Sequence, residues 1–212
     1  MLKSKHKLFF DFTKEEEWLS KMSENGFALI SVNSFAKYTF QKVEPRKYNY
    51  KIDYRLFKSS NDLLDYCALF EDSGWKHIWG TKNSGSQYFV RLNDNASDDI
   101  FSDSASKAGR YRRLSCMWLS LLTAFFSMFV ALFMTNHQYL ATAFTNPEAL
   151  YYTPGLWGMN GVEFWRAFLF ETPFAIGRGF MWLLYLLILI FYFIAFLKSF
   201  LLYRRYLKET LR

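Results

Sequence analysis

The sequence predicts an α+β cytoplasmic domain followed by a two-helix transmembrane hairpin. Residues 114–134 form an apolar run without a charged side chain. As a helix this run would be roughly 31 Å long at about 1.5 Å per residue, which matches the hydrocarbon core of a bilayer. Residues 180–197 form a second apolar run. Before them, short aromatic segments alternate with helix-like segments, which is typical of a mixed α+β domain.

The first part of the domain predicts one strand, one helix and two further strands. Residues 6–12 are expected to form the first strand. Thr13 is the expected N-cap of the helix, because a threonine hydroxyl can accept a hydrogen bond from a free amide of the first turn. Gly26 is expected to end that helix in a left-handed conformation. Residues 27–32 and 35–43 follow as strands.

The same order then repeats. Residues 48–55 predict a strand, Asn61 or Asp62 caps a helix, and residues 75–79 and 87–92 predict two strands. Three pairs of segments correspond: FFDF with KIDY, NGF with SGW, and KYTF with QYFV. We therefore predict two strand-helix-strand-strand repeats in an antiparallel-rich sheet, with two helices on one face.

Two alternatives in this domain stay open. Its aromatic side chains are expected to fill the core, and the alternative is an aromatic surface that binds a ligand. Asp11 and Asp53 fall at matching places in the two repeats. A pair of carboxylates could form a catalytic site, and the alternative is a pair of salt bridges at strand ends.

These patterns together predict six segments of the chain. They are the domain at 1–95, an acidic and serine-rich linker with a basic juxtamembrane collar at 96–113, the first span at 114–134, an aromatic extracytoplasmic loop at 135–179, the second span at 180–203, and a basic tail at 204–212. Residues 160–170 are expected to form an interfacial helix within the loop, between Gly161 and the helix-stopping Pro173.

Basic residues flank the outer ends of both spans. They are expected to anchor the chain at anionic lipid headgroups of the inner leaflet, which would place both termini in the cytoplasm. The pI of about 9.3 then needs no nucleic-acid partner. The predicted anchors are Lys107, Arg110, Arg112, Arg113, Lys198, Arg204 and Arg205.

The first span carries a stripe of small residues at helical spacing. Small side chains let membrane helices pack closely, and Tyr185 and Tyr192 of the second span are the expected counterparts. A polar pathway is the alternative, but the run contains no ionisable side chain other than one thiol. The stripe consists of Cys116, Ser120, Thr123, Ser127 and Ala131.

The loop between the spans is rich in aromatic residues. Trp157, Trp165 and Arg166 are its candidate contacts for a lipid-soluble ligand, a peptide or a partner's span. The alternative is a segment that lies at the membrane interface and only closes the hairpin.

Motifs for catalysis are absent from the sequence. It contains no phosphate-binding loop, dinucleotide fingerprint, metalloprotease helix or nucleophile elbow. With two cysteines and three histidines that are far apart in sequence, a four-ligand zinc site is not expected. We therefore expect no enzyme activity, no catalytic residue, no cofactor and no metal.

A series of segments resembles the bacterial family known as domain of unknown function 2812. These segments are EEEWLSKMSENGF, FAKYTF, YNYKIDYR, LFEDSGW and IFSDSASKAGRYRR, in this order over roughly residues 5–113. The resemblance implies a protein of Gram-positive bacteria with C-terminal membrane segments. Genes of such proteins often lie beside those of PadR-like repressors, and the family has no assigned activity or catalytic residues.

From the resemblance and the two spans we expect a regulatory or sensory accessory protein of the bacterial cell membrane. Its cytoplasmic domain would bind a protein partner through a Tyr/Trp-rich sheet surface, and homo-oligomerisation is a further option. The alternative is an accessory subunit of a membrane transporter or efflux system.

Overall fold

The structure is a computed structural model that describes residues 2–33, 36–92 and 97–210. The first residue, part of the turn expected near residue 34, the start of the predicted linker and the last two residues of the predicted tail lie outside the described residues. The chain divides into two compact units. The domain unit comprises residues 1–116 and 195–212, and the hairpin unit comprises residues 117–194.

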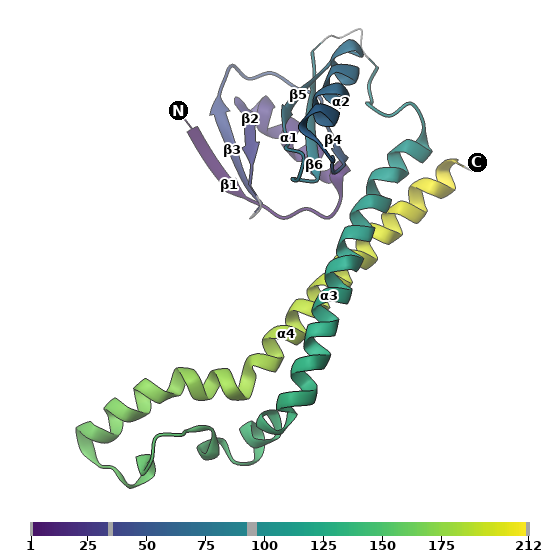
Figure 1. Ribbon diagram of the computed structural model, residues 1–212. Helices are drawn as coiled ribbons and strands as arrows, with labels where there is room; N and C mark the ends of the chain where they lie inside the picture. Colours follow the sequence, from purple (N-terminus) through teal and green to yellow (C-terminus); the bar gives the residue numbers. More distant parts are fainter. Residues whose placement is uncertain (1, 34–35, 93–96, 211–212) are drawn as a thin grey trace. The chain divides into compact units, whose positions relative to one another are not determined.

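The predicted order of two strand-helix-strand-strand repeats is confirmed (Figure 1). The first repeat consists of β1 (Leu2–His6), α1 (Phe12–Glu24), β2 (Phe27–Val32) and β3 (Lys37–Lys42), and the second of β4 (Tyr50–Tyr54), α2 (Ser60–Asp72), β5 (Trp75–Trp79) and β6 (Ser86–Arg91). The prediction of a single sheet is wrong. Each repeat forms its own antiparallel sheet, in the orders β1-β3-β2 and β4-β6-β5.

Local details also repeat between the two halves. Gly26 and Gly74 follow the two helices with φ of +80° and +82°, values that glycine adopts without steric cost. In each repeat the second strand carries an irregularity at the same place, in β2 between Leu29 and Ser31 and in β5 between His77 and Trp79. The two sheets are therefore close structural copies of each other.

The start of the first repeat differs from the expectation. Strand β1 ends at His6, so the FFDF segment lies outside any strand and its correspondence with KIDY is wrong. Asp11, not Thr13, is the N-cap of α1, and its carboxylate accepts a hydrogen bond from the Thr13 amide at 3.0 Å. Helix α2 is capped by Ser59 in a capping box with Asp62, so the helix begins before the expected caps.

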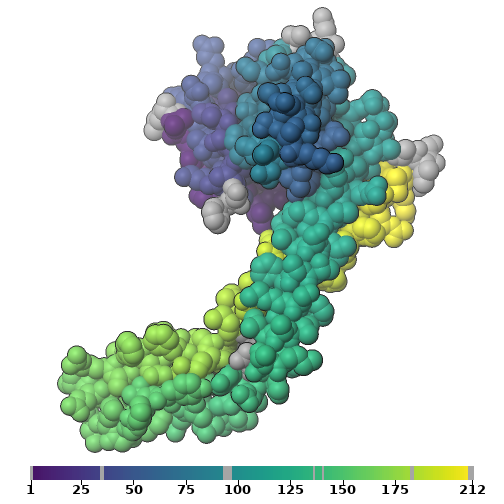
Figure 2. All heavy atoms as spheres, viewed as in Figure 1, coloured from purple at the N-terminus to yellow at the C-terminus, as the bar shows by residue number. Residues whose placement is uncertain are grey.

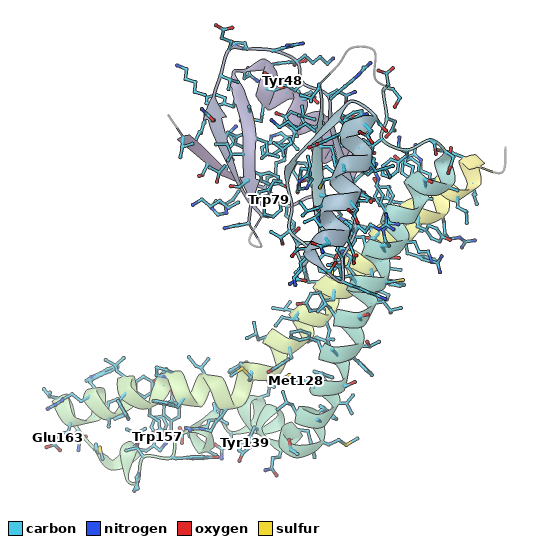
Figure 3. All side chains as sticks on the ribbon, turned by 45° about the horizontal axis from the view of Figure 1, so that its top comes forward. Tyr48, Trp79, Met128, Tyr139, Trp157 and Glu163 are labelled. Atoms are coloured by element: carbon cyan, nitrogen blue, oxygen red, sulfur yellow. The ribbon has the colours of Figure 1, made fainter. Side chains whose placement is uncertain are left out.

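Aromatic side chains fill the core of the domain unit, as expected. Trp75 and Phe89 are fully buried and pack with Tyr66. Full burial of such a side chain stabilises the fold by about 1.5–3 kcal/mol. Other aromatic rings of the domain, including that of Trp79, are half-buried. Trp79 lies at the end of β5 (Figure 3). The expected Tyr/Trp-rich binding surface is thus largely core.

Two long helices follow. They are α3 (Ser104–Thr145) and α4 (Gly161–Thr210), joined through the 3₁₀ turns η1 (Pro147–Leu150) and η2 (Leu156–Gly158). Residues 104–135 and 184–209 are long and apolar enough to cross a membrane.

The expected interfacial helix at residues 160–170 is the beginning of α4, which continues through Pro173. A proline removes only one backbone hydrogen bond, and the Thr172 hydroxyl donates to the Phe168 carbonyl in the same turn at 2.6 Å. The connection between the helices is therefore much shorter than the predicted loop.

Candidate functional site

The first turns of α3 are packed into the domain unit through a buried arginine. The Arg110 side chain is 0% exposed. One of its terminal nitrogens donates to Glu16 Oε1 of α1 at 2.5 Å and to the Ile52 carbonyl of β4 at 2.6 Å. Arg110 thus joins α3 to both repeats at once.

Aromatic rings surround the rest of this guanidinium. Its central carbon lies 5.2 Å from the ring centroids of Phe12 and Phe101 and 5.1 Å from that of Tyr111. Two guanidinium nitrogens, Nε and Nη2, have no hydrogen-bond partner within the described part of the chain. Contact with ring faces offsets part of the cost of burying the charge, and Glu16 supplies the opposite charge.

A second ion pair lies one turn further along α3. Arg113 Nη2 is 2.6 Å from Asp53 Oδ1 of β4, and its Nε donates to the Tyr54 carbonyl. The Tyr66 hydroxyl of α2 donates to the other oxygen of Asp53 at 2.7 Å. Burial and the Asp53 carboxylate raise the pKa of Tyr66. This tyrosine therefore remains a hydrogen-bond donor at neutral pH.

Glu15 forms the proton-binding part of the site. It is 4% exposed, and the hydroxyls of Tyr38 in β3 and Tyr88 in β6 both donate to its Oε1 at 2.7 Å. Burial raises the pKa of Glu15 to about 7, although the two hydrogen bonds act in the opposite direction. The carboxyl that joins the two sheets thus changes its charge near neutral pH.

The end of α4 reaches the start of α1 as well. The Tyr206 ring stacks on Tyr111 of α3 with centroids 5.3 Å apart, and its hydroxyl is 3.0 Å from the Thr13 hydroxyl. The Tyr111 hydroxyl donates to Asp11 at 2.7 Å. Both long helices therefore contact the first turn of α1.

Asp11 and Asp53 do not form a pair. Asp11 caps α1 and accepts from Tyr111, whereas Asp53 lies in β4 and contacts Arg113 and Tyr66. Both are structural partners of α3 in this arrangement, which favours the salt-bridge alternative for Asp53.

The structure places several predicted headgroup anchors inside the domain unit. Arg110 is buried and Arg113 is paired with Asp53, because α3 begins at Ser104 and spends its first turns against the repeats. The buried position of Arg110 contradicts a contact with lipid headgroups. Lys107 pairs with Asp99 at 3.0 Å, and Lys198 lies 4.8 Å from the Phe10 ring centroid. For the exposed Arg112, Arg204 and Arg205, headgroup contact stays a prediction.

The predicted packing stripe lies on a different face of α3 from the aromatic contacts of the hairpin unit. All five of its residues, Cys116, Ser120, Thr123, Ser127 and Ala131, are exposed. Tyr192 of α4 instead packs against Trp118 and Phe125 of α3, with ring centroids 5.9 and 5.1 Å apart. Large rings bury more surface than small side chains do, which favours this face.

The aromatic connection packs on the beginning of α4. Trp157 lies 5.3 Å from Tyr151 and 6.2 Å from Phe164, and Trp165 lies 5.9 Å from Phe168, all between ring centroids (Figure 3). Trp157 and Trp165 are still 48% and 57% exposed. Arg166 is exposed and lies outside this cluster.

A charged clamp, whose pairing the sequence analysis did not predict, holds the connection. Glu171 accepts hydrogen bonds from the Tyr152 amide at 3.1 Å, the Thr153 hydroxyl at 2.6 Å and Arg178 at 2.5 Å. These donors lower the pKa of Glu171 to about 2. The spacing of seven residues between Glu171 and Arg178 places them on one face of α4 and is a signal that could have identified the pair.

Sequence reasoning also missed Glu15 and Arg110 as buried charges. Glu15 shares helical spacing with Leu19 and Met22, which are buried. Its place on the apolar face of the helix could therefore have been predicted from the sequence. No such signal marks Arg110, because Arg112 and Arg113 beside it have the same character in the sequence. Among the described residues, no group of three or more His, Cys, Asp or Glu side chains could hold a metal ion.

Comparison with known proteins identifies the family. No curated protein matches the chain, and no solved structure matches it. The family described as "Protein of unknown function (DUF2812)" matches residues 11–123, from the N-cap of α1 into the apolar part of α3. This range includes the buried Glu15, Glu16, Asp53 and Arg110 and the more exposed Arg113, so the charged residues of the site lie within the matched region. The chain belongs to the DUF2812 family.

Proposed function

We propose that the protein is a regulatory or sensory accessory of the bacterial cell membrane, whose repeat domain binds a protein partner in the cytoplasm. The contact of Tyr206 with Tyr111 and Thr13 carries this proposal. Through it the inner ends of both long helices touch the first turn of α1. A shift of one helix against the other would therefore disturb the domain directly. A simple membrane anchor would not require such a contact.

The partner contact is assigned to the outer side of α2. Helix α2 (blue) lies on the surface of the domain unit (Figure 2). Only Tyr66 of this helix is buried, whereas Leu64 and Leu69 are 64% and 63% exposed. Leu56, just before the helix, is 59% exposed. Large apolar side chains exposed on and next to one helix offer a partner contact area that water would otherwise cover. This surface replaces the expected Tyr/Trp contact, whose rings lie mostly in the core.

Photo-crosslinking in native membranes tests the partner contact. A photoreactive amino acid replaces Leu64 or Leu69 in the full chain, and Lys42 on β3 is the exposed control position. We expect one transcription factor or kinase to be captured from α2 and not from Lys42. Equal capture from all three positions would contradict the assigned surface, and capture of a permease would support the alternative below.

A variant of the helix junction tests the coupling. In the crosslinking strain, Tyr206→Ala removes the ring that contacts Tyr111 and should change the yield of the partner crosslink. Arg205→Ala, at an exposed neighbouring position, is the matched control and should leave the yield unchanged. If Tyr206→Ala left the yield of the partner crosslink unaltered, the coupling would be refuted and the hairpin would serve only as a membrane anchor.

The alternative function is an accessory subunit of a transporter or efflux system. A groove of about 600 Å³ on the hairpin unit is lined by Thr123 and Ser127 together with Leu189 and Phe193. Small exposed side chains in an apolar groove permit close approach of a further membrane helix. Crosslinkers at Thr123 or Ser127 that capture a permease would favour this function over the first.

The cytoplasmic placement of both termini is part of the proposal. Basic residues at the beginning of residues 104–135 and at the end of residues 184–209 support it through the positive-inside rule. A reporter enzyme that is active only in the cytoplasm, fused before residue 1, should be active. An extracytoplasmic signal from that fusion would refute the topology.

A further inference from the structure

A cavity lies in the hairpin unit where α3 and α4 approach the aromatic connection. Its volume is about 400 Å³, which is within the usual range of small-molecule sites. It is lined mainly by apolar atoms and is partly open. Its walls are formed by Leu132 and Tyr139 of α3, Tyr152 of the connection, and Gly177, Arg178, Met181 and Tyr185 of α4.

Among the described residues of this lining, Arg178 is the one charged group, and its charge is already neutralised. Arg178 is 2.5 Å from Glu171 and donates from Nε to the Leu150 carbonyl at 2.9 Å. Its guanidinium also lies 4.0 Å from the centroid of the Tyr152 ring. Since its charge is paired with Glu171 and its Nε and Nη2 donors are used within the protein, an anionic ligand would gain little from Arg178. The electrostatics favour an uncharged ligand.

Tyrosine hydroxyls supply the remaining polar groups. The Tyr152 hydroxyl donates a hydrogen bond to the Tyr139 hydroxyl, which raises the pKa of Tyr152, so these two hydroxyls are engaged with each other. The Tyr185 hydroxyl has no hydrogen-bond partner within the described part of the chain. It can therefore donate to or accept from a ligand in the cavity.

Two glycines on α4 differ in the space beside them, and one of them lines the cavity. At Gly179 an added methyl group would lie 2.9 Å from Leu150 Cδ1 and 3.0 Å from Ala143 Cβ, so this glycine permits close packing. At Gly177, two residues earlier, the same methyl group would meet no neighbouring atom within 4 Å. Gly177 thus leaves room in the cavity that packing does not require.

We propose that this cavity binds an uncharged amphiphile, with a hydroxyl or carbonyl head at Tyr185 and an apolar body along Leu132 and Met181. The cavity lies beside the ends of residues 104–135 and 184–209, the segments that could cross a membrane, so such a molecule can enter it from the bilayer. This inference rests on the proposed sensory function and names the class of ligand that the sensor would detect.

Photolabelling of the full chain in lipid nanodiscs tests the site. The probes are diazirine-bearing derivatives of decanol, decanoate and decane, which share a chain and differ in the head. We expect decanol to label peptides that contain Leu132 or Met181, and decanoate and decane to label them at least about fivefold less, the ratio that one typical hydrogen bond supplies.

Three variants sharpen the test. Gly177→Leu fills the cavity and should reduce decanol labelling by about tenfold or more. Tyr185→Phe should reduce it by about fivefold, through loss of one hydrogen bond. Ala141→Leu places the same new side chain at an exposed position of α3 outside the cavity and should leave labelling unchanged. Labelling spread evenly along both helices, or unaffected by Gly177→Leu, would overturn the proposal.

Lipid extraction from the purified protein separates two sources of the ligand. A neutral amphiphile that co-purifies with the wild type and not with Gly177→Leu would come from the membrane. Specific decanol labelling without a co-purifying molecule would indicate an external lipophilic compound. None of these labelling assays needs a protein partner. If decanol labels the site specifically but does not change the yield of the partner crosslink, the sensory function is contradicted and the binding site is retained. A partner crosslink without specific labelling would refute the site alone.

Discussion

Replacing Glu15 by glutamine should remove a loss of stability that the protein undergoes as the pH rises towards 7. Glu15 is buried between two tyrosine hydroxyls, and burial raises its pKa from 4.5 to about 7. Glutamine has a similar shape and can still accept both hydrogen bonds through its carbonyl oxygen, but it does not titrate. The substitution therefore isolates the effect of the buried proton.

The size of the effect follows from the difference between the two pKa values. Below pH 4.5 the carboxyl is protonated in both the folded and the unfolded state. Between 4.5 and about 7 only the folded state keeps the proton, so the free energy of unfolding falls as the pH rises. At about 1.4 kcal/mol per pKa unit, the loss is about 3 kcal/mol by pH 8.

Urea unfolding of the full chain in detergent micelles measures this loss. Near-ultraviolet circular dichroism follows the core around Trp75, which is fully buried. The quantity of interest is the difference in unfolding free energy between wild type and Glu15→Gln, at pH 4.5 and at pH 8. Because His77, Asp99 and other groups titrate equally in both proteins, their contributions cancel.

Tyr50→Phe is the matched control. It removes a buried hydroxyl that accepts from the Leu29 amide at 3.4 Å and does not contact Glu15. Its effect on stability should be the same at both pH values. If wild type and Glu15→Gln showed parallel pH dependence within about 0.5 kcal/mol, the reasoning on Glu15 would be refuted.

Three further substitutions test the packing of both units, in the urea assay except where another measurement is named. Arg110→Met should destabilise the domain unit by about 3 kcal/mol, because it leaves a buried carboxylate without its main partner, whereas Arg112→Met at an exposed position should change stability by less than about 0.5 kcal/mol. Gly179→Leu should cost about 1–3 kcal/mol through overpacking against Ala143, measured as a lower melting temperature of the hairpin helices by far-ultraviolet circular dichroism. Gly85→Ala should cost at least about 1 kcal/mol, since φ at this position is +76° and the added methyl group would lie 2.5 Å from the Tyr54 ring; equal stability would contradict the backbone conformation.

The buried charges suggest how the domain and the helices depend on each other. Arg110 donates hydrogen bonds to α1 and β4, and Glu15 accepts hydrogen bonds from β3 and β6. Breaking a buried pair by removing one partner is costly, whereas the intact pair is worth little. Such a site therefore favours one arrangement of α3 against the repeats over others. This is the property that a coupling element requires.

The sequence by itself determined the repeat order and the two long apolar segments. Both depend on local information: strand alternation, the Asn-Gly and Ser-Gly helix exits at residues 25–26 and 73–74, and runs without charge. The same local information misplaced the first strand, which ends at His6, and selected Thr13 in place of Asp11 as the N-cap of the following helix. The local information also ended the helix predicted at residues 160–170 before Pro173. One lost backbone hydrogen bond does not end a long apolar helix, and α4 continues through this proline.

Only the tertiary structure decided which basic residues face the domain and which face of α3 meets α4. The partner of Arg110 is 94 residues away in the sequence, so its burial cannot be read from its neighbours. The small-residue stripe and the aromatic face of α3 both have helical spacing, and the choice between them depends on the rings that α4 presents, such as Tyr192. A charge is buried or a face is covered only when the matching groups arrive from distant segments. For that reason the collar, which the sequence alone presents as a membrane anchor, is in the structure also the joint between α3 and the two repeats.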